Sequence, residues 1–204
     1  SVHSRGVPSI IFHAVVEGRC TILGDGETEP RILEPGDVVV LTRGQGHTIA
    51  SDPALASVPL QSLESVRGAV PILQQEGADP TGLVCGTFVL QHAASRTLLS
   101  LLPDVIHLSG AEGSPVAQWL DTTLKMLLGE LVSERPGSDT IIARLADVLF
   151  VYVLRSHVSS LPEKATGWLA ATRNPAIGRA IALIHKDPAA RWTASTIAAK
   201  VGMS

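Results

Sequence analysis

The chain has 204 residues, of which 45% are hydrophobic and only 3% aromatic, and its formal net charge is −3. This hydrophobic content is enough for a packed core and excludes a disordered chain, while two cysteines are too few for a disulfide framework. No apolar run reaches the roughly 18 residues of a membrane span and the first residues resemble no secretion signal, so we expect a cytoplasmic protein without membrane contact.

The first half of the chain has the pattern of β-structure. From Ile10 to about Leu108, short apolar runs alternate with turn residues at close spacing, which is typical of an all-β barrel or sandwich. The polar stretch 51–81 interrupts this rhythm and is a candidate lid. Residues 1–110 are therefore expected to form a β-barrel domain.

The stretch from Gly36 to His47, GDVVVLTRGQGH, is the most informative part of this half. Its apolar run is too short for a helix and is bracketed by glycines, which predicts a strand that enters a tight turn. Gly44 and Gly46 tolerate backbone angles that other residues resist. The chain can therefore fold back and aim His47 into the space that the strand encloses.

The second half changes to helical periodicity. Apolar residues recur at spacings of three and four in 116–131, directly after Ser114-Pro115, and again in 141–157. Two amphipathic helices are expected to form a hairpin within 111–160. The hairpin either covers the barrel, pairs with a second subunit, or does both, because each role needs an apolar face.

The C-terminal end is short and basic. Residues 161–173 are expected to be a linker, and 174–204 to hold two short helices whose first turns are capped by Asn174 and Thr193. Residues 173–204 carry five Lys or Arg against one Asp, a net charge of +4. A basic segment after an acidic body indicates nucleic-acid contact at this end of the chain.

Four side chains are candidate metal ligands: His13, Glu17, His47 and Cys85. Two imidazoles and a carboxylate suit a divalent transition metal, Zn²⁺ first, and the thiol of Cys85 would be a fourth, soft ligand. In the alternative interpretation, His13 is a hydrogen-bonded strand residue and Glu17 is solvated. His47 is then a loop residue, and Cys85 a small buried hydrophobe. No residue is predicted to be catalytic.

Two segments resemble the cupin family. Residues 36–47 follow the pattern G-x5-T-x-G-x2-H of the second cupin motif, with Thr42 in the place of a proline, and residues 13–24 follow H-x3-E-x6-G, the end of the first. Ile11 stands where metal-dependent cupins have a further histidine. The resemblance implies a cupin-like, jelly-roll β-barrel with room for a ligand over about the first hundred residues.

Residues 192–204 resemble the first part of the helix-turn-helix of AraC-type (AraC/XylS) transcription regulators, including its Gly-Met-Ser turn. Those regulators join a cupin-like sensor, a helical dimerisation region and two helix-turn-helix units in this order. The resemblance implies a non-enzymatic homodimer that binds a small-molecule effector. It also implies operator DNA as a partner of the full-length protein only, because the chain is expected to end before the recognition helix.

Two other readings stay open. The chain is a metal-dependent cupin enzyme, an isomerase or dioxygenase, whose helices merely cover the barrel, or it is a stand-alone binding module. The fold class expected with the AraC-type reading is mainly β plus α: a cupin-like barrel, a helical hairpin and the start of a helix-turn-helix domain.

Overall fold

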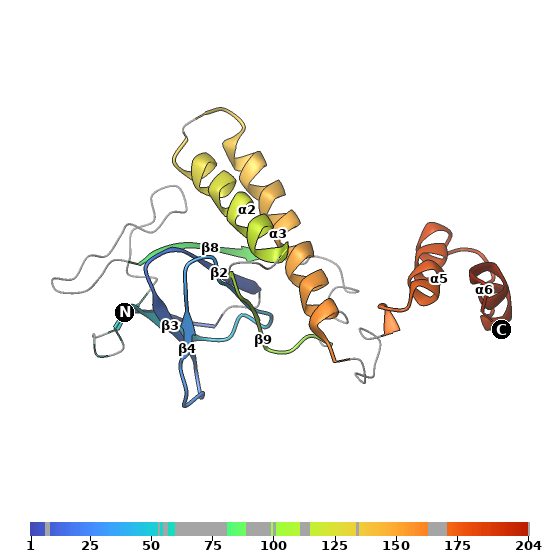
Figure 1. The fold of residues 1–204 in the computed structure, drawn as a ribbon, viewed down its shortest axis with the longest axis horizontal. Coiled ribbons are helices and arrows are strands. Elements are labelled where there is room, and N and C mark those ends of the chain that lie inside the picture. The colour runs from blue at the N-terminus through green and yellow to red at the C-terminus, as the bar shows by residue number, and fades with distance from the viewer. Residues whose placement is uncertain are drawn as a thin grey trace. The chain divides into compact units, whose positions relative to one another are not determined.

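The computed structural model describes residues 1–6, 9–52, 54, 57–59, 81–88, 99, 101–110, 115–133, 135–162 and 171–203. The chain divides into two compact units, Ser1–Val153 and Leu154–Ser204, which are treated separately below (Figure 1). Most of the expected lid at 51–81 lies outside the described residues. Among the helices of the described ranges, none is long and apolar enough to cross a membrane.

The first unit begins with β-strands that form two sheets. In chain order the strands are β1 (Val2–Ser4), β2 (Ile10–Glu17), β3 (Cys20–Gly24), β4 (Arg31–Leu33), β5 (Val38–Leu41), β6 (His47–Ala50), β7 (Val58–Pro59), β8 (Gly82–Phe88) and β9 (Val105–Leu108). The outer sheet has the order β4-β3-β6-β1-β7 and the inner sheet the order β8-β2-β5-β9. Neighbouring strands are antiparallel except β1 and β7.

The mixed fold, β first and α after it, is confirmed, but the expected closed barrel is not. In the part of the chain that the structure describes, no ladder joins an edge of one sheet to an edge of the other, so the strands form a two-sheet sandwich. The sheets are held together by apolar side chains between them instead. Ile11 and Val15 of β2 meet Ile22 of β3 and Ile49 of β6 in one buried cluster.

The centre of the inner sheet is buried on both faces, because helices cover the side that faces away from the outer sheet. All four residues of β5 are buried, which explains why its sequence, VVVL, lacks the polar alternation of a half-exposed strand. On the helical side, the rings of Phe12 and Phe88 stack with centroids 5.2 Å apart. Phe88 in turn lies 4.9 Å from Phe150 of the helical hairpin.

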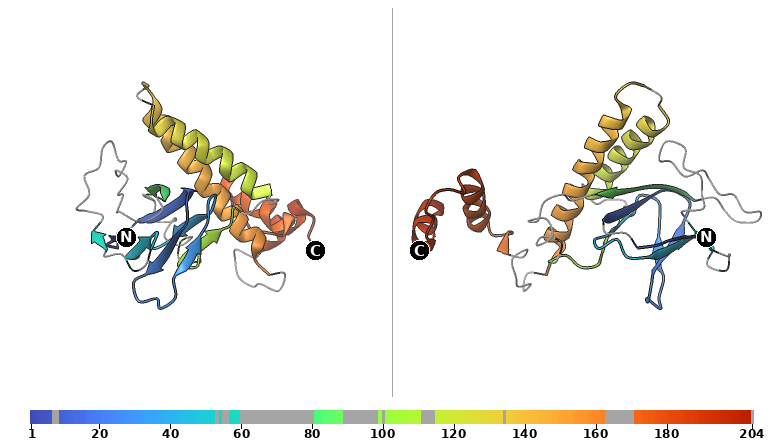
Figure 2. Two further views of the ribbon diagram at one scale, coloured as in Figure 1. Left: turned by 60° about the vertical axis from the view of Figure 1, so that its left-hand side comes forward. Right: turned by 180° about the vertical axis from the view of Figure 1, so that it is seen from behind.

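The hairpin consists of α2 (Pro115–Leu131) and α3 (Ser138–Ser160), which lie side by side against the inner sheet (Figures 1 and 2). Leu120 and Leu124 of α2 and Leu149 of α3 are at most 3% exposed, so one stripe of each helix is in the core. Trp119 stacks on Tyr152 with ring centroids 3.5 Å apart, which joins the two helices to each other. The expected covering role of the hairpin is present in the structure.

The second unit contains α5 (Pro175–Lys186) and α6 (Ala194–Val201). Asn174 caps α5, as expected, by accepting a hydrogen bond from the backbone N–H of Ala176. Thr193 and Thr196 form a capping box at the start of α6, and Gly202 ends that helix in the left-handed conformation with φ of 73°. These local signals were sufficient to place both helices.

Candidate functional site

Three of the four predicted site residues meet between the two sheets. His13 lies on β2, opposite Cys85 of β8 in the strand register, and His47 begins β6 of the outer sheet. Nε2 of His13 is 2.8 Å from Nε2 of His47, and Nδ1 of His13 is 2.9 Å from Sγ of Cys85. Glu17 lies apart: it is the last and exposed residue of β2, beyond a shift in the register with β8.

The two histidines are deeply buried. His13 is 4% exposed and His47 is 1% exposed. Cys85 is exposed as a residue, but burial of its thiol raises the pKa of that group to about 12. Burial, with a smaller contribution from the nearby His47, lowers the pKa of His13 from 6.5 to about 3. Burial also lowers the pKa of His47, although its hydrogen bond to the backbone of Gln45 opposes the shift. Both imidazoles are therefore uncharged near neutral pH.

Hydrogen-bond chemistry assigns the protons along this chain of contacts. The carbonyl oxygen of Gln45 can only accept, so Nδ1–H of His47 donates to it across 3.0 Å. A neutral imidazole has one N–H, so Nε2 of His47 accepts from Nε2–H of His13. Nδ1 of His13 then has a lone pair and accepts from the thiol of Cys85. We call this series, from Cys85 through His13 and His47 to the Gln45 carbonyl, the histidine relay.

The glycine-rich turn that precedes His47 has the role expected from the sequence. Gly44 has φ of 57°, a conformation that other residues rarely adopt. The carboxylate of Asp25 lies against Gly46, where a Cβ atom would be only 2.1 Å from Oδ2. The backbone of the turn therefore favours glycine at Gly44, whereas a side chain at position 46 would displace the exposed carboxylate of Asp25.

Thr42, which replaces the proline of the cupin motif, has a clear structural role. Its hydroxyl donates to the carbonyl of Pro103 across 2.7 Å. Nε2 of Gln45 donates to the carbonyl of Asp104 across 3.0 Å. These bonds fix the turn after β5 to the segment that leads into β9, and so support the position of His47 from outside the relay.

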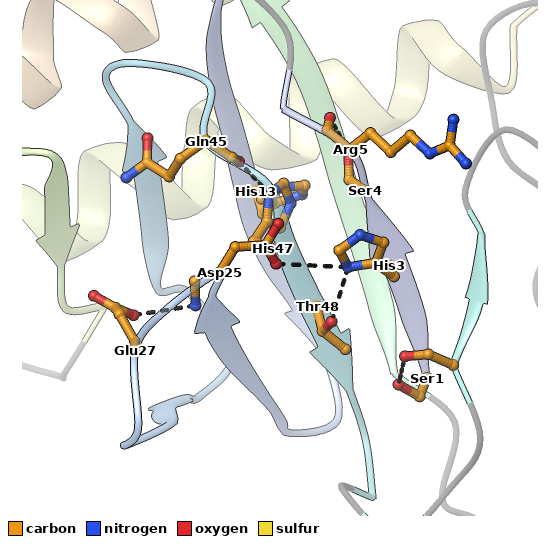
Figure 3. A network of polar contacts seen from close by, with 12 residues as sticks. Ser1, His3, Ser4, Arg5, His13, Asp25, Glu27, Gln45, His47 and Thr48 are labelled. Carbon is orange, nitrogen blue, oxygen red and sulfur yellow. Dashed lines mark hydrogen bonds and ion pairs between the residues drawn. The ribbon is translucent and has the colours of Figure 1, made fainter.

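Polar side chains of β1 and its neighbours lie beside His47, and they were not among the predicted site residues. His3 of β1 lies 3.1 Å from the hydroxyl of Thr48 and 3.9 Å from the carboxylate of Asp25 (Figure 3). The register pairs Ser4 with His47, which brings β1 next to the relay. No sequence signal for β1 was recognised, because the predicted β region began only at Ile10.

Asp37 forms a second buried polar cluster, which was also missed. Only 4% exposed, it accepts hydrogen bonds from the backbone N–H groups of Gly110 (2.8 Å) and Glu34 (3.1 Å) and from Nε2 of His107 (3.0 Å). Burial works to raise the pKa of Asp37, but the bonds from Gly110, Glu34 and His107 outweigh it and hold the pKa below 3.8. We call this group the Asp37 clasp; it fixes the end of β9, where the chain leaves the sandwich.

The predicted metal ligands are not assembled as one set. Nε2 of His13 and Nε2 of His47 are close enough to share one ion, but Cys85 occupies the other ring nitrogen of His13. The two nitrogens of an imidazole point apart, so one ion cannot take both positions. Within the described ranges, no group of three His, Cys, Asp or Glu side chains is placed to hold a metal ion. Metal binding by the two histidines stays a prediction.

Comparisons with known proteins agree with both resemblances found in the sequence. Residues 1–159 match the cupin family model described as Cupin. Two AraC-like transcription regulators, from Streptomyces antibioticus and Streptomyces lividans, are 32% and 34% identical over 95% of this chain. The chain spans 63% and 62% of their respective lengths.

A crystal structure of an apo ToxT variant from Vibrio cholerae also aligns, with 11% identity over 98% of this chain and 64% of that one. Its TM-score of 0.44 is too low to add to the argument. The AraC-type resemblance is confirmed by the sequence relatives. Since the cupin model covers 159 residues, well over half of the chain, this protein belongs to the cupin family.

Proposed function

We propose that this chain is the sensing and dimerisation region of an AraC-type DNA-binding transcription regulator that acts in the cytoplasm. In this proposal the cupin sandwich binds a small-molecule effector, the α2–α3 hairpin forms a homodimer, and the chain catalyses no reaction. The observation that carries it is the order of parts: a cupin half, a helical hairpin, and then a capped helix pair that resembles the helix-turn-helix of these regulators.

The outer face of the hairpin supports the homodimer. Ile141, Val148 and Val151 of α3 are 46%, 45% and 51% exposed, and Met126 of α2 is 57% exposed. Spacings of seven and three residues put the three α3 side chains on one side of the helix. An apolar face of this kind is costly in water, and a second copy of the chain would cover it.

The second unit supports contact with DNA in the whole regulator. Nη2 of Arg179 on α5 donates to the carbonyl of Val201 at the end of α6 across 3.0 Å, which holds the two helices together. Lys186, Arg191 and Lys200 supply further positive charge on this unit. Such charge gives salt-sensitive attraction to phosphate, while operator reading belongs to a recognition helix, which in the helix-turn-helix follows the turn at Gly202.

Sedimentation velocity tests the dimer. The wild type should sediment as a dimer, and Val148→Asp should shift it to monomer because a carboxylate would be buried at the interface. Val132→Asp is the matched control: Val132 is 81% exposed but lies just after the end of α2, outside the α3 stripe, and should leave the dimer intact. A wild-type monomer would refute the dimerisation part of the proposal.

A metal-dependent cupin enzyme is the second candidate, favoured by one observation. The Nε2 atoms of His13 and His47 face each other at 2.8 Å, a separation that two ligands each about 2.0–2.1 Å from one zinc ion can span. Elemental analysis of the purified chain and of His47→Ala decides the question. Stoichiometric metal that the variant loses, together with an activity lost in parallel, would favour the enzyme.

A further inference from the structure

All hydrogen bonds of the histidine relay donate in the same direction, from Cys85 towards the Gln45 carbonyl. This direction restricts which ligands can bind at the Cys85 end. Its acceptor end, the Gln45 carbonyl, is already occupied by His47. At its other end the lone pair of His13 Nδ1 is satisfied by the thiol of Cys85, which is a weak donor. His13 and His47 are buried, and Cys85 is exposed as a residue although its thiol is enclosed, so the relay comes nearest to solvent at its Cys85 end.

The geometry points to an effector that is uncharged and mainly apolar, and that places a hydroxyl donor on Nδ1 of His13 in place of the Cys85 thiol. This inference rests on the proposed sensing function and names its ligand class. A hydroxyl is a stronger donor than a thiol, so the exchange improves the hydrogen bond at the end of the relay.

The strand register defines the surroundings of this position. The pair His13–Cys85 lies between the pairs Ile11–Thr87 and Val15–Leu83 on β2 and β8. Ile11, Val15 and Leu83 belong to the apolar cluster between the sheets, and none of the six residues is an acid, a lysine or an arginine. A ligand here would therefore contact mainly hydrocarbon, with Nδ1 of His13 and the hydroxyl of Thr87 as the polar points.

Anions are disfavoured at this position by the same proton assignment. A carboxylate has only lone pairs and would face the lone pair of Nδ1, since the one N–H of His13 is committed to His47. The apolar surroundings would also leave its charge without compensation. An alcohol or phenol carries the required donor without this cost.

Nuclear magnetic resonance of the histidine ring nitrogens tests the inference on the full chain, with a chelator present to exclude metal. Without ligand, His13 should be protonated at Nε2 and His47 at Nδ1; the opposite state of either ring would overturn the inference. Phenol, anisole and benzoate are then titrated as probes. They share an aromatic ring and differ in donor and charge, so phenol should perturb Nδ1 of His13 at the lowest concentration.

Two substitutions at Cys85 should act in opposite directions. Cys85→Ala leaves Nδ1 of His13 without a donor and should strengthen phenol binding, whereas Cys85→Ser supplies a competing hydroxyl and should weaken it. One hydrogen bond corresponds to a difference of roughly three- to tenfold in affinity between the two variants. Cys20→Ala is the matched control and should bind phenol like the wild type, because Cys20 is not part of the relay.

Three further results would overturn the inference: benzoate binding as well as phenol, equal phenol affinity of Cys85→Ala and Cys85→Ser, or no response of His13 to phenol in Cys85→Ala. These outcomes are separate from the test of the proposed function. A monomer in sedimentation would reject the dimer and leave the ligand class standing, while a dimer whose His13 ignores phenol would reject the ligand class alone.

Discussion

Asp37→Asn removes the charge at the centre of the clasp while changing the shape of the side chain very little. In the wild type, Oδ1 accepts from Gly110, and Oδ2 accepts from both Glu34 and His107. Asparagine keeps one oxygen, so the bond from Gly110 can persist. Its NH₂ group then faces the N–H of Glu34, and this buried backbone donor loses its acceptor.

The magnitude follows from these contacts. One orphaned buried donor costs about 1–3 kcal/mol, and the remaining bond loses the added strength of an ionised acceptor. We expect Asp37→Asn to lower the free energy of unfolding of the first unit by about 2–3 kcal/mol. For a chain of this size, that corresponds to a fall in Tm of roughly 5–10 °C.

Urea denaturation followed by circular dichroism measures this loss, and its pH dependence provides a second check. The clasp lowers the pKa of Asp37 in the folded protein. Its contribution to the free energy of unfolding is therefore present above the unfolded-state pKa near 3.8 and is lost as the pH falls through the lower folded-state value. The difference in the free energy of unfolding between wild type and Asp37→Asn should be largest at neutral pH and should shrink in acid.

Asp104→Asn is the matched control, because Asp104 pairs with Arg43 but its side chain is 65% exposed. Exposed ion pairs contribute about 0–1 kcal/mol, so this variant should remain close to the wild type. If Asp37→Asn lay within about 0.5 kcal/mol of the wild type at neutral pH, a value typical of surface changes, the reasoning about the clasp would be wrong.

Three further results are expected. Gly86→Ala should lower the free energy of unfolding by about 1–3 kcal/mol, because a Cβ there would lie 2.4 Å from Cε1 of Phe12; an unchanged urea midpoint would contradict this. Thr193→Ala removes the capping box of α6 and should cost about 0.5–2 kcal/mol, seen as faster amide exchange in that helix, and unchanged exchange would count against it. Iodoacetamide should label Cys20 only in urea, because Cys20 is 1% exposed and burial raises its pKa to about 11; labelling of Cys20 in the folded protein would oppose the described core.

Local patterns predicted the elements whose causes are local. Asn174, Thr193 and Gly202 act on the helix ends next to them, and the structure places all three as caps. His13 and Cys85 were both named as candidates for one site, and they meet because their strands pair in register. His47 was found from the glycines that turn the chain just before it.

Features that depend on distant partners could not be predicted in the same way. Asp37 follows a turn glycine and looks like an ordinary turn residue, yet His107 and Gly110 lie more than 60 residues further along the chain. Strict strand alternation would put Glu17 on the same face as His13, but the register with β8 shifts between Val15 and Glu17. The prediction of a closed barrel was wrong for a similar reason, because a sequence does not show which strand edges remain unpaired.

A native mass spectrum of the purified chain is the most direct test of the central claim, because it reports oligomeric state, bound metal and retained ligand together. The proposed regulator function predicts a dimer of 21.4 kDa chains. A monomer that carries one metal ion per chain would contradict it and favour the cupin enzyme.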